Sequence, residues 1–334
     1  SETVTVSVSE ATAGTPITLT ATLESGRRVA LSADGIVIAH STISADNGTA
    51  TFTMPVNSVV LTAMFTDFPA GYAEAHTVNG SLFRMNSVPG GKTYIMGEHA
   101  RSTTQTVTLT KNFWMGETEV TQGLWEAVWG PFWPETDPDG SGYGSGINYP
   151  AYYVSWYDVV AFCNLLTAAD NVVANNDQVY YSDAQLSVVY TKADADNNTE
   201  VYVDWTKKGY RIPTSAEWEY AARYIDGISW NHGNHASGDT AYACYNDSNC
   251  SHTLASDDRL REYAWYNKNN GSSGTASYGT KEVSLKKPNT LGLYDMSGNL
   301  QEWAYDLYSN SYSGVLIDPC GPDSGTTRVM RRGN

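Results

Sequence analysis

The stretch that decides the fold of this chain is Gly292-Leu293-Tyr294-Asp295-Met296-Ser297-Gly298-Asn299-Leu300-Gln301-Glu302-Trp303. It combines apolar side chains that can pack into a core with two turn residues, Gly298 and Asn299, at which the backbone can reverse. The reversal leaves two carboxylates, Asp295 and Glu302, able to point at one place. Core, turn and candidate site therefore share one short segment.

Three further motifs precede this stretch in the chain. They are Met115-Gly116-Glu117-Thr118-Glu119-Val120-Thr121, Val154-Ser155-Trp156-Tyr157-Asp158-Val159-Val160-Ala161-Phe162-Cys163-Asn164 and Tyr210-Arg211-Ile212-Pro213-Thr214-Ser215-Ala216-Glu217-Trp218-Glu219-Tyr220-Ala221-Ala222-Arg223. In type and order, the four motifs resemble the signature of the formylglycine-generating-enzyme family, the sulfatase-modifying factors. The resemblance covers about residues 85–334 and implies an α+β domain with that family's variant of the C-type-lectin fold.

The first part of the chain has a different composition, since residues 1–91 contain no Lys, Trp or Cys. Apolar and polar residues alternate there in short runs such as 17–23, which predicts β-strands separated by turn residues such as those at 46–48. We therefore predict two domains. The first, over residues 1–75, is a small all-β sandwich that resembles bacterial immunoglobulin-like modules and acts as a spacer. The second, over residues 85–334, is the lectin-like domain, cut short at its C-terminus.

Two helices of the second domain are marked by capping residues. Ser155 lies three residues before Asp158, and Thr214 lies three residues before Glu217, so each hydroxyl can accept a hydrogen bond from a first-turn amide. Apolar residues follow both caps at helical spacing. Residues 171–206, between the two helices, predict an elaborated hairpin region with short strands.

The charge of the chain excludes one class of partner. Asp and Glu total 36 against 20 Lys and Arg, a formal net charge of -16. A field of this sign repels phosphate backbones, so we do not expect nucleic acid to bind. No apolar stretch approaches the roughly 20 residues of a transmembrane helix, and no secretory signal peptide is visible.

The family resemblance implies a calcium site formed by Asp295, Gly298, Leu300 and Glu302. In that arrangement the two side chains and the backbone carbonyls of the middle positions bind the ion. Calcium takes about six to eight oxygen ligands, so carboxylates and carbonyls around one tight turn are suitable donors. The alternative is that the two carboxylates bind nearby amides or arginines and that no ion is present.

A second cluster of metal-ligand residues occupies the polar segment that follows. It consists of His232, His235, Cys244, Cys250 and His252. Structural zinc sites use closely spaced pairs at both ends, whereas Cys244 and Cys250 are separated by five residues. A polar loop, in which these two cysteines can form a disulfide, is the favoured interpretation. Cys163 lies among apolar residues of a predicted helix and is expected to be a buried thiol.

The oxidase members of the resembled family use a pair of copper-binding cysteines placed after an Arg-Val-x-Arg-Gly-Gly-Ser motif. This chain ends at Arg328-Val329-Met330-Arg331-Arg332-Gly333-Asn334, and Arg332 and Asn334 depart from the motif. None of the four cysteines lies at a matching position. We therefore expect no copper and assign no catalytic residue.

Among non-enzymatic relatives, the chain most resembles the variable proteins of diversity-generating retroelements. This implies a ligand-binding display protein whose diversified segment lies at or after the C-terminus. The implied ligand-binding residues are Arg328, Met330, Arg332 and Asn334. The expected ligand is a protein or a carbohydrate, and the expected location is the bacterial cell surface or another extracytoplasmic site, with a lipid anchor before Ser1.

Two other functions stay open on the sequence. The first is a formylglycine-generating oxidase or related family enzyme whose catalytic cysteines lie in a tail after Asn334. The second is a purely structural surface module. A pair of cysteines four residues apart downstream of Asn334 would favour the oxidase.

Overall fold

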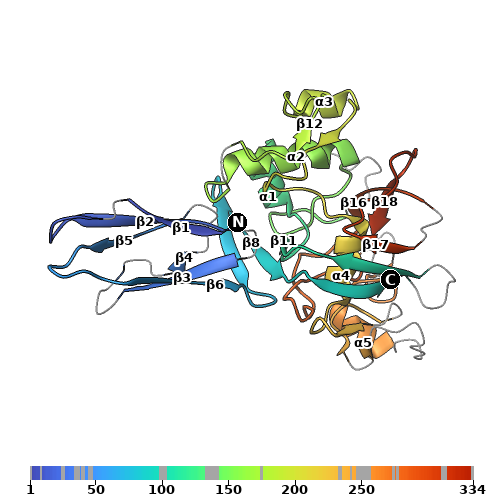
Figure 1. The fold of residues 1–334 in the computed structure, drawn as a ribbon. Coiled ribbons are helices and arrows are strands. Elements are labelled where there is room, and N and C mark those ends of the chain that lie inside the picture. Colours follow the sequence, from blue (N-terminus) through green and yellow to red (C-terminus); the bar gives the residue numbers. More distant parts are fainter. Residues whose placement is uncertain are drawn as a thin grey trace.

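The computed structural model describes residues 2–7, 10–23, 27–33, 38, 42–43, 48–97, 104–131, 143–173, 176–231, 235–240, 243–245, 257–272, 275, 278–309 and 314–331. Strands that precede residue 68 form an elongated unit on the left of Figure 1, and the helices and remaining strands form a larger rounded unit on the right. The described residues thus form a part that contains strands only and a part that contains strands and helices.

The N-terminal unit consists of two three-stranded antiparallel sheets. Their strand orders are β1 (Thr3–Val6), β2 (Pro16–Thr22), β5 (Thr49–Thr53) and β4 (Thr42–Ile43), β3 (Arg27–Ala33), β6 (Leu61–Asp67). Alternate residues of β2 and β3 are buried, among them Ile17, Leu19, Val29 and Leu31, and they form one core with Phe52 of β5. The predicted small all-β sandwich is confirmed. Its relation to immunoglobulin-like modules stays a prediction.

The C-terminal unit contains short sheets rather than one large sheet. The three-stranded ones have the orders β11 (Phe113–Gly116), β8 (Ser81–Val88), β7 (Ala73–Val78) and β17 (Val315–Ile317), β10 (Gln105–Leu109), β9 (Lys92–Met96). The two-stranded ones pair β12 (Tyr180–Tyr181) with β13 (Tyr202–Val203), β14 (Ser229–Asn231) with β15 (Ala243–Tyr245), and β16 (Glu302–Leu307) with β18 (Arg328–Arg331). Because β7 and β8 join β11, residues 73–88 share a sheet with the second unit; the domain limits 1–75 and 85–334 stay predictions.

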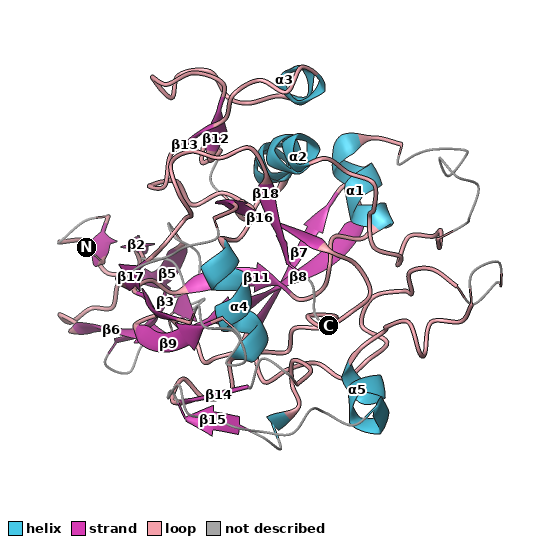
Figure 2. Ribbon diagram, turned by 90° about the vertical axis from the view of Figure 1, so that its right-hand side faces the viewer, coloured by secondary structure: helices cyan, strands magenta, loops and turns pink. Residues whose placement is uncertain are grey.

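The described helices are α1 (Gln122–Trp129), α2 (Trp156–Ala169), α3 (Lys192–Asp196), α4 (Ser215–Arg223) and α5 (Asp257–Tyr263). Figure 2 shows α1, α2 and α3 at one end of the unit, α5 at the other and α4 between them. Both predicted caps are present, because Ser155 and Thr214 each form a capping box with the acidic residue three positions on. None of these helices is long and apolar enough to cross a membrane.

Helix α4 is surrounded by the main core of this unit. Tyr220 of α4 packs against Tyr94 of β9 and Trp230 of β14, and all three rings are almost completely buried. Leu293 and Met296 belong to the same core, so the stretch that decides the fold does supply core residues. This mixed arrangement of small sheets and few helices is the predicted α+β class.

Within residues 171–206 the structure corrects one expectation. The strands around Tyr180 and Tyr202 form and pair, and Val189 forms an isolated antiparallel bridge with Tyr181, but the segment that follows this bridge is helix α3 rather than extended chain. Thr191 accepts a hydrogen bond from the amide of Asp194, whose carboxylate accepts one from the amide of Thr191. This capping box starts the helix where residue alternation alone indicates an extended chain.

Candidate functional site

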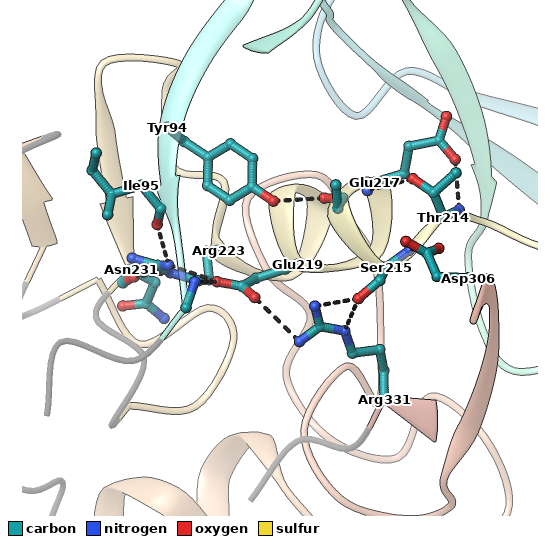
Figure 3. Close-up of polar contacts among 12 residues, drawn as sticks. Tyr94, Ile95, Thr214, Ser215, Glu217, Glu219, Arg223, Asn231, Asp306 and Arg331 are labelled. Carbon is teal, nitrogen blue, oxygen red and sulfur yellow. Dashed lines mark hydrogen bonds and ion pairs between the residues drawn. The ribbon is translucent and has the colours of Figure 1, made fainter. Parts of the chain in front are cut away.

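The C-terminal strand β18 is anchored to helix α4 by a buried ion-pair network (Figure 3). The Glu219 carboxylate accepts hydrogen bonds from Nη1 of Arg223 at 2.8 Å and from Nη1 of Arg331 at 3.2 Å. Burial alone would raise the pKa of Glu219, but the two arginines and the amide of Gly97 outweigh it, and the pKa lies below its usual value. Glu219 therefore stays charged and holds both arginines.

Ser215, the first residue of α4, supplies a second anchor. Its Oγ accepts a hydrogen bond from Nε of Arg331 at 2.8 Å and another from Nη2 of the same side chain. Its backbone amide donates to Oδ2 of Asp306 in β16 at 2.6 Å. Both strands of the β16–β18 pair are thus tied to the N-terminus of α4, as Figure 3 shows.

The strand presents its residues to different surroundings. Arg331 reaches α4, whereas the preceding residue, Met330, is 50% exposed and lies opposite Trp303 of β16. Of the four predicted ligand-binding residues, Arg332 and Asn334 lie outside the described residues. Met330 is thus a described residue of this set with a side chain open to solvent.

Arg328 is held among aromatic rings. Its guanidinium carbon lies 3.6 Å from the ring centre of Trp156 and 5.5 Å from that of Tyr305. Its Nη1 donates a hydrogen bond to the carbonyl oxygen of Tyr305 at 2.7 Å. Burial lowers the pKa of this guanidinium. Arg328 is therefore a partly buried cation with a fixed position, and its predicted ligand-binding role stays a prediction.

The turn of the stretch 292–303 is built from left-handed backbone. The φ angles are 55° at Asp295, 89° at Gly298 and 52° at Asn299. A Cβ added to Gly298 would lie 2.0 Å from the carbonyl oxygen of Trp265, so only glycine fits there. The amide of Asn299 donates to the same carbonyl at 3.0 Å. The sequence signal for a tight turn is correct.

The two carboxylates of the turn are partly or fully enclosed. Asp295 is 2% exposed; its Oδ2 accepts a hydrogen bond from the amide of Ser284 at 2.8 Å, and its Oδ1 has no hydrogen-bond partner among the described residues. Oε2 of Glu302 accepts from Nε1 of Trp218 at 3.1 Å. Burial, and then the charge of Asp295, raise the pKa of Glu302 to about 7 in spite of the Trp218 hydrogen bond.

A third carboxylate reaches this turn from a distant part of the chain. Oε2 of Glu119 accepts a hydrogen bond from Nδ2 of Asn299 at 2.7 Å, and Oε1 accepts from the amide of Leu300 at 3.0 Å. Burial and the nearby charges of Glu302 and Asp295 raise its pKa well above the usual value. Sequence analysis missed this role, although Glu119 lies within the second quoted motif.

A model of the Sulfatase-modifying factor enzyme 1-like domain matches residues 70–334, most of the chain. The chain belongs to this family. Among solved structures, it is similar to Treponema denticola variable protein 1, at 30% identity and a TM-score of 0.54, over 78% of this chain and 87% of the other. That protein is called a variable protein, and variable proteins are the class that the motifs of this chain resemble.

Two curated proteins illustrate the sequence similarity. A chaperone protein LppX of Paenibacillus barcinonensis is 32% identical over 212 residues, which are 60% of this chain and 64% of that protein. A formylglycine-generating enzyme of Thermomonospora curvata is 27% identical over 216 residues, which are 63% of this chain and 52% of the enzyme. The chain thus spans about half to two thirds of the length of these relatives.

The turn offers part of what a calcium ion requires. Among the described residues Oδ1 of Asp295 has no hydrogen-bond partner, and a cation would favour the charged forms of Asp295, Glu302 and Glu119, whose pKa values burial raises. Within the described ranges, however, no three His, Cys, Asp or Glu side chains converge as a metal site would require. A bound ion would depend on backbone carbonyls, such as those of Gly298 and Leu300, and the predicted ligand set stays a prediction.

The thiols that the structure describes differ in environment. Cys163 is buried, and burial raises its pKa to about 12, which agrees with the predicted buried thiol. Cys320 is exposed and free. The side chain of Cys244, and all of Cys250, lie outside the described residues. The proposed disulfide between these two cysteines therefore stays a prediction.

The predicted alternative of a zinc site in this region falls mostly outside the described residues, which exclude His232 and His252. His235 is described and buried, with Nδ1 3.7 Å from Oδ2 of Asp239. Asp239 is also held by Arg259, whose Nε donates to it at 2.9 Å. His235 therefore lies beside an ion pair, in surroundings that fit a structural histidine.

Proposed function

We propose that this chain is a non-enzymatic, ligand-binding display protein of the sulfatase-modifying factor family. In this proposal the α4 core is a fixed frame, and the segment at or after the C-terminus carries changeable side chains for a protein or carbohydrate ligand. The bacterial cell surface or another extracytoplasmic site is the proposed location. The N-terminal sandwich then acts as a spacer.

One observation carries this proposal: adjacent residues of β18 have opposite environments. Arg331 is anchored by Glu219 and Ser215, whereas Met330 is 50% exposed. A display frame requires this division, because the strand must keep its position while the side chains that meet the ligand vary. The similarity to Treponema denticola variable protein 1 supports the same assignment.

The experiment compares substitutions at the two adjacent positions. Met330→Lys, Met330→Asp and Met330→Tyr should each change the free energy of unfolding by less than about 0.5 kcal/mol, because they affect an exposed side chain. Arg331→Met should cost about 2–4 kcal/mol, because Glu219 and Ser215 lose buried partners. Urea unfolding followed by tryptophan fluorescence measures both.

Equal losses at Met330 and Arg331 would contradict the division into frame and display surface. A library randomised at Met330, Arg332 and Asn334 should then yield folded clones that bind a chosen protein or glycan. If folded clones are abundant and none binds a target more tightly than the parent chain does, the display proposal fails. The alternative of a purely structural module is then favoured.

The oxidase alternative is favoured by one observation, the similarity to the formylglycine-generating enzyme of Thermomonospora curvata. Copper-dependent oxidation of a substrate thiol needs convergent thiolate ligands. Cys163 is buried with a raised pKa, so it is a poor ligand. Purified chain incubated with copper and a peptide containing Cys-x-Pro-x-Arg should leave that cysteine unoxidised. Turnover detected by mass spectrometry would reverse the proposal in favour of the enzyme.

We also propose calcium as a structural ion of the turn 295–302. Asp295 and Glu302 would provide carboxylate oxygens, and Gly298 and Leu300 would provide carbonyl oxygens. The unpartnered Oδ1 of Asp295 supports this assignment. The ion would stabilise the turn that supports β16, and it has no proposed role in a reaction.

A further inference from the structure

Among the described residues, three arginines bind a carboxylate through two parallel donors: Arg211 binds Glu217 through Nη1 and Nη2, and Arg27 and Arg259 use the edge formed by Nε and Nη2. Arg27 donates through this edge to both oxygens of Glu2, at 3.1 and 3.0 Å. Arg259 donates through it to both oxygens of Asp239. Two parallel N–H bonds match the two oxygens of a carboxylate, which makes this the strongest arginine–carboxylate geometry.

Arg328 departs from this pattern. Its Nη1 is bonded to the carbonyl of Tyr305, and within the described ranges no carbonyl or carboxylate oxygen accepts a hydrogen bond from Nε or Nη2. Among those residues no carboxylate lies within ion-pair distance, although the chain carries 36 acidic residues. The guanidinium also donates a hydrogen bond to the side chain of Tyr305, and the hydroxyls of Tyr157 and Tyr180 act on it electrostatically.

The surroundings of Arg328 also hold the guanidinium in one plane. It stacks on Trp156, which is 3% exposed and whose Nε1 is bonded to the carbonyl of Ala304 at 3.1 Å. The Tyr305 hydrogen bond fixes the rotation within that plane. A planar cation fixed in this way loses little entropy when a second group binds to its free edge.

We propose that the Nε–Nη2 edge of Arg328 binds a carboxylate of the ligand that this protein recognises. This inference rests on the proposed display function and assigns the ligand an acidic group. Trp205, which is 40% exposed and lies edge-on to Tyr305 at 5.0 Å, gives the same neighbourhood an open aromatic surface for the body of the ligand. An acidic sugar and an acidic peptide side chain share the required chemistry.

The test titrates the full chain with three carboxylate probes, namely acetate, glucuronate and N-acetylglutamate, and with acetamide as the neutral counterpart. The observable is the side-chain Nε–H signal of Arg328 in ¹⁵N-labelled protein, assigned by its loss in Arg328→Lys. Carboxylates should shift this signal saturably, and acetamide should not. Tighter binding of glucuronate than of N-acetylglutamate indicates a sugar acid; the reverse indicates a peptide.

Two variants provide the controls. Arg328→Lys keeps a cation over Trp156 but lacks the two-donor edge, so carboxylate affinity measured by calorimetry should fall about fivefold or more. Arg261→Gln removes an exposed cation and should leave the affinity unchanged. Absence of a saturable shift, or an equal loss in both variants, would overturn the inference. The inference would also be overturned if a ligand selected with the randomised library bound Arg328→Lys as tightly as the parent chain. That result would leave the proposed display function in place.

Discussion

At the scale of single residues, the buried carboxyl group of Asp306 should make the stability of this fold depend on pH. Asp306 is 2% exposed and accepts a hydrogen bond from the amide of Ser215. Burial raises its pKa from 3.8 to about 6. The folded state therefore binds a proton more tightly than the unfolded state does. This contribution to stability is complete below about pH 4 and is lost as the pH rises through about 6.

Asp306→Asn should remove this pH dependence, because the amide does not titrate but can still accept from Ser215. Relative to the parent chain, the variant should gain about 2–3 kcal/mol in free energy of unfolding between pH 4 and pH 7. Urea unfolding at a series of pH values measures the difference. Asp323→Asn, at an exposed site, is the control and should give a parallel curve. Parallel curves for Asp306→Asn would refute the assignment.

At the scale of elements, the turn 295–302 depends on contacts from several distant segments. Glu119 contacts it from the segment before α1, Ser284 from the segment that precedes it, and Trp218 from α4. Burial raises the pKa of Glu119, Asp295 and Glu302, and the charge of Asp295 raises those of the two glutamates further, so charged carboxylates at this junction are costly without a cation. The stability of the junction should therefore depend on a bound divalent ion.

Chelation with EGTA should lower the melting temperature by about 5 °C, since a ligand at about one hundred times its Kd contributes roughly 2.7 kcal/mol. Glu302→Gln should lower the melt to a similar extent and make it insensitive to EGTA. Glu262→Gln is the control, because Glu262 pairs at the surface with Lys287. An unchanged melt after chelation and in Glu302→Gln, with no metal by elemental analysis, would remove calcium from the proposal.

For the whole molecule, the two units have separate cores. The core of the sandwich contains no residue from the C-terminal unit. Contacts across the junction include a hydrogen bond from Asn112 to Asp67 at 3.0 Å and one from Lys208 to the carbonyl of Leu23 at 2.9 Å. Polar contacts of this kind orient a spacer but contribute little to the stability of either core.

A chain that starts at Phe68 should therefore fold without the sandwich. Phe68 is included because it is buried against Tyr72 and Trp114 of the second unit. We expect the melting temperature of residues 68–334 to stay within about 3 °C of the corresponding transition in the full chain. Calorimetry of both chains measures this. Loss of a cooperative transition would show that the sandwich is part of the folding unit.

The sequence by itself determined what depends on neighbouring residues. The capping residues Ser155 and Thr214 and the alternation in 16–22 are decided within a few positions of the chain, where propensity and turn chemistry act. The turn at Gly298 was also visible in the sequence, but the close approach of Trp265 that excludes any side chain there was not. The four ordered motifs added the family and with it the α+β fold. Helix α3 escaped notice because a local capping box overrode the apparent alternation.

Only the tertiary structure decided what depends on distant segments. Glu119 reaches Asn299, 180 positions away, and no local pattern encodes that meeting. Neighbouring residues of a strand point to opposite faces, but only the packing of β18 against α4 decides that Arg331 meets Glu219 while Met330 stays exposed. Side-chain surroundings are set by which elements pack together, since burial and charge pairing arise only once distant parts of the chain are brought into contact.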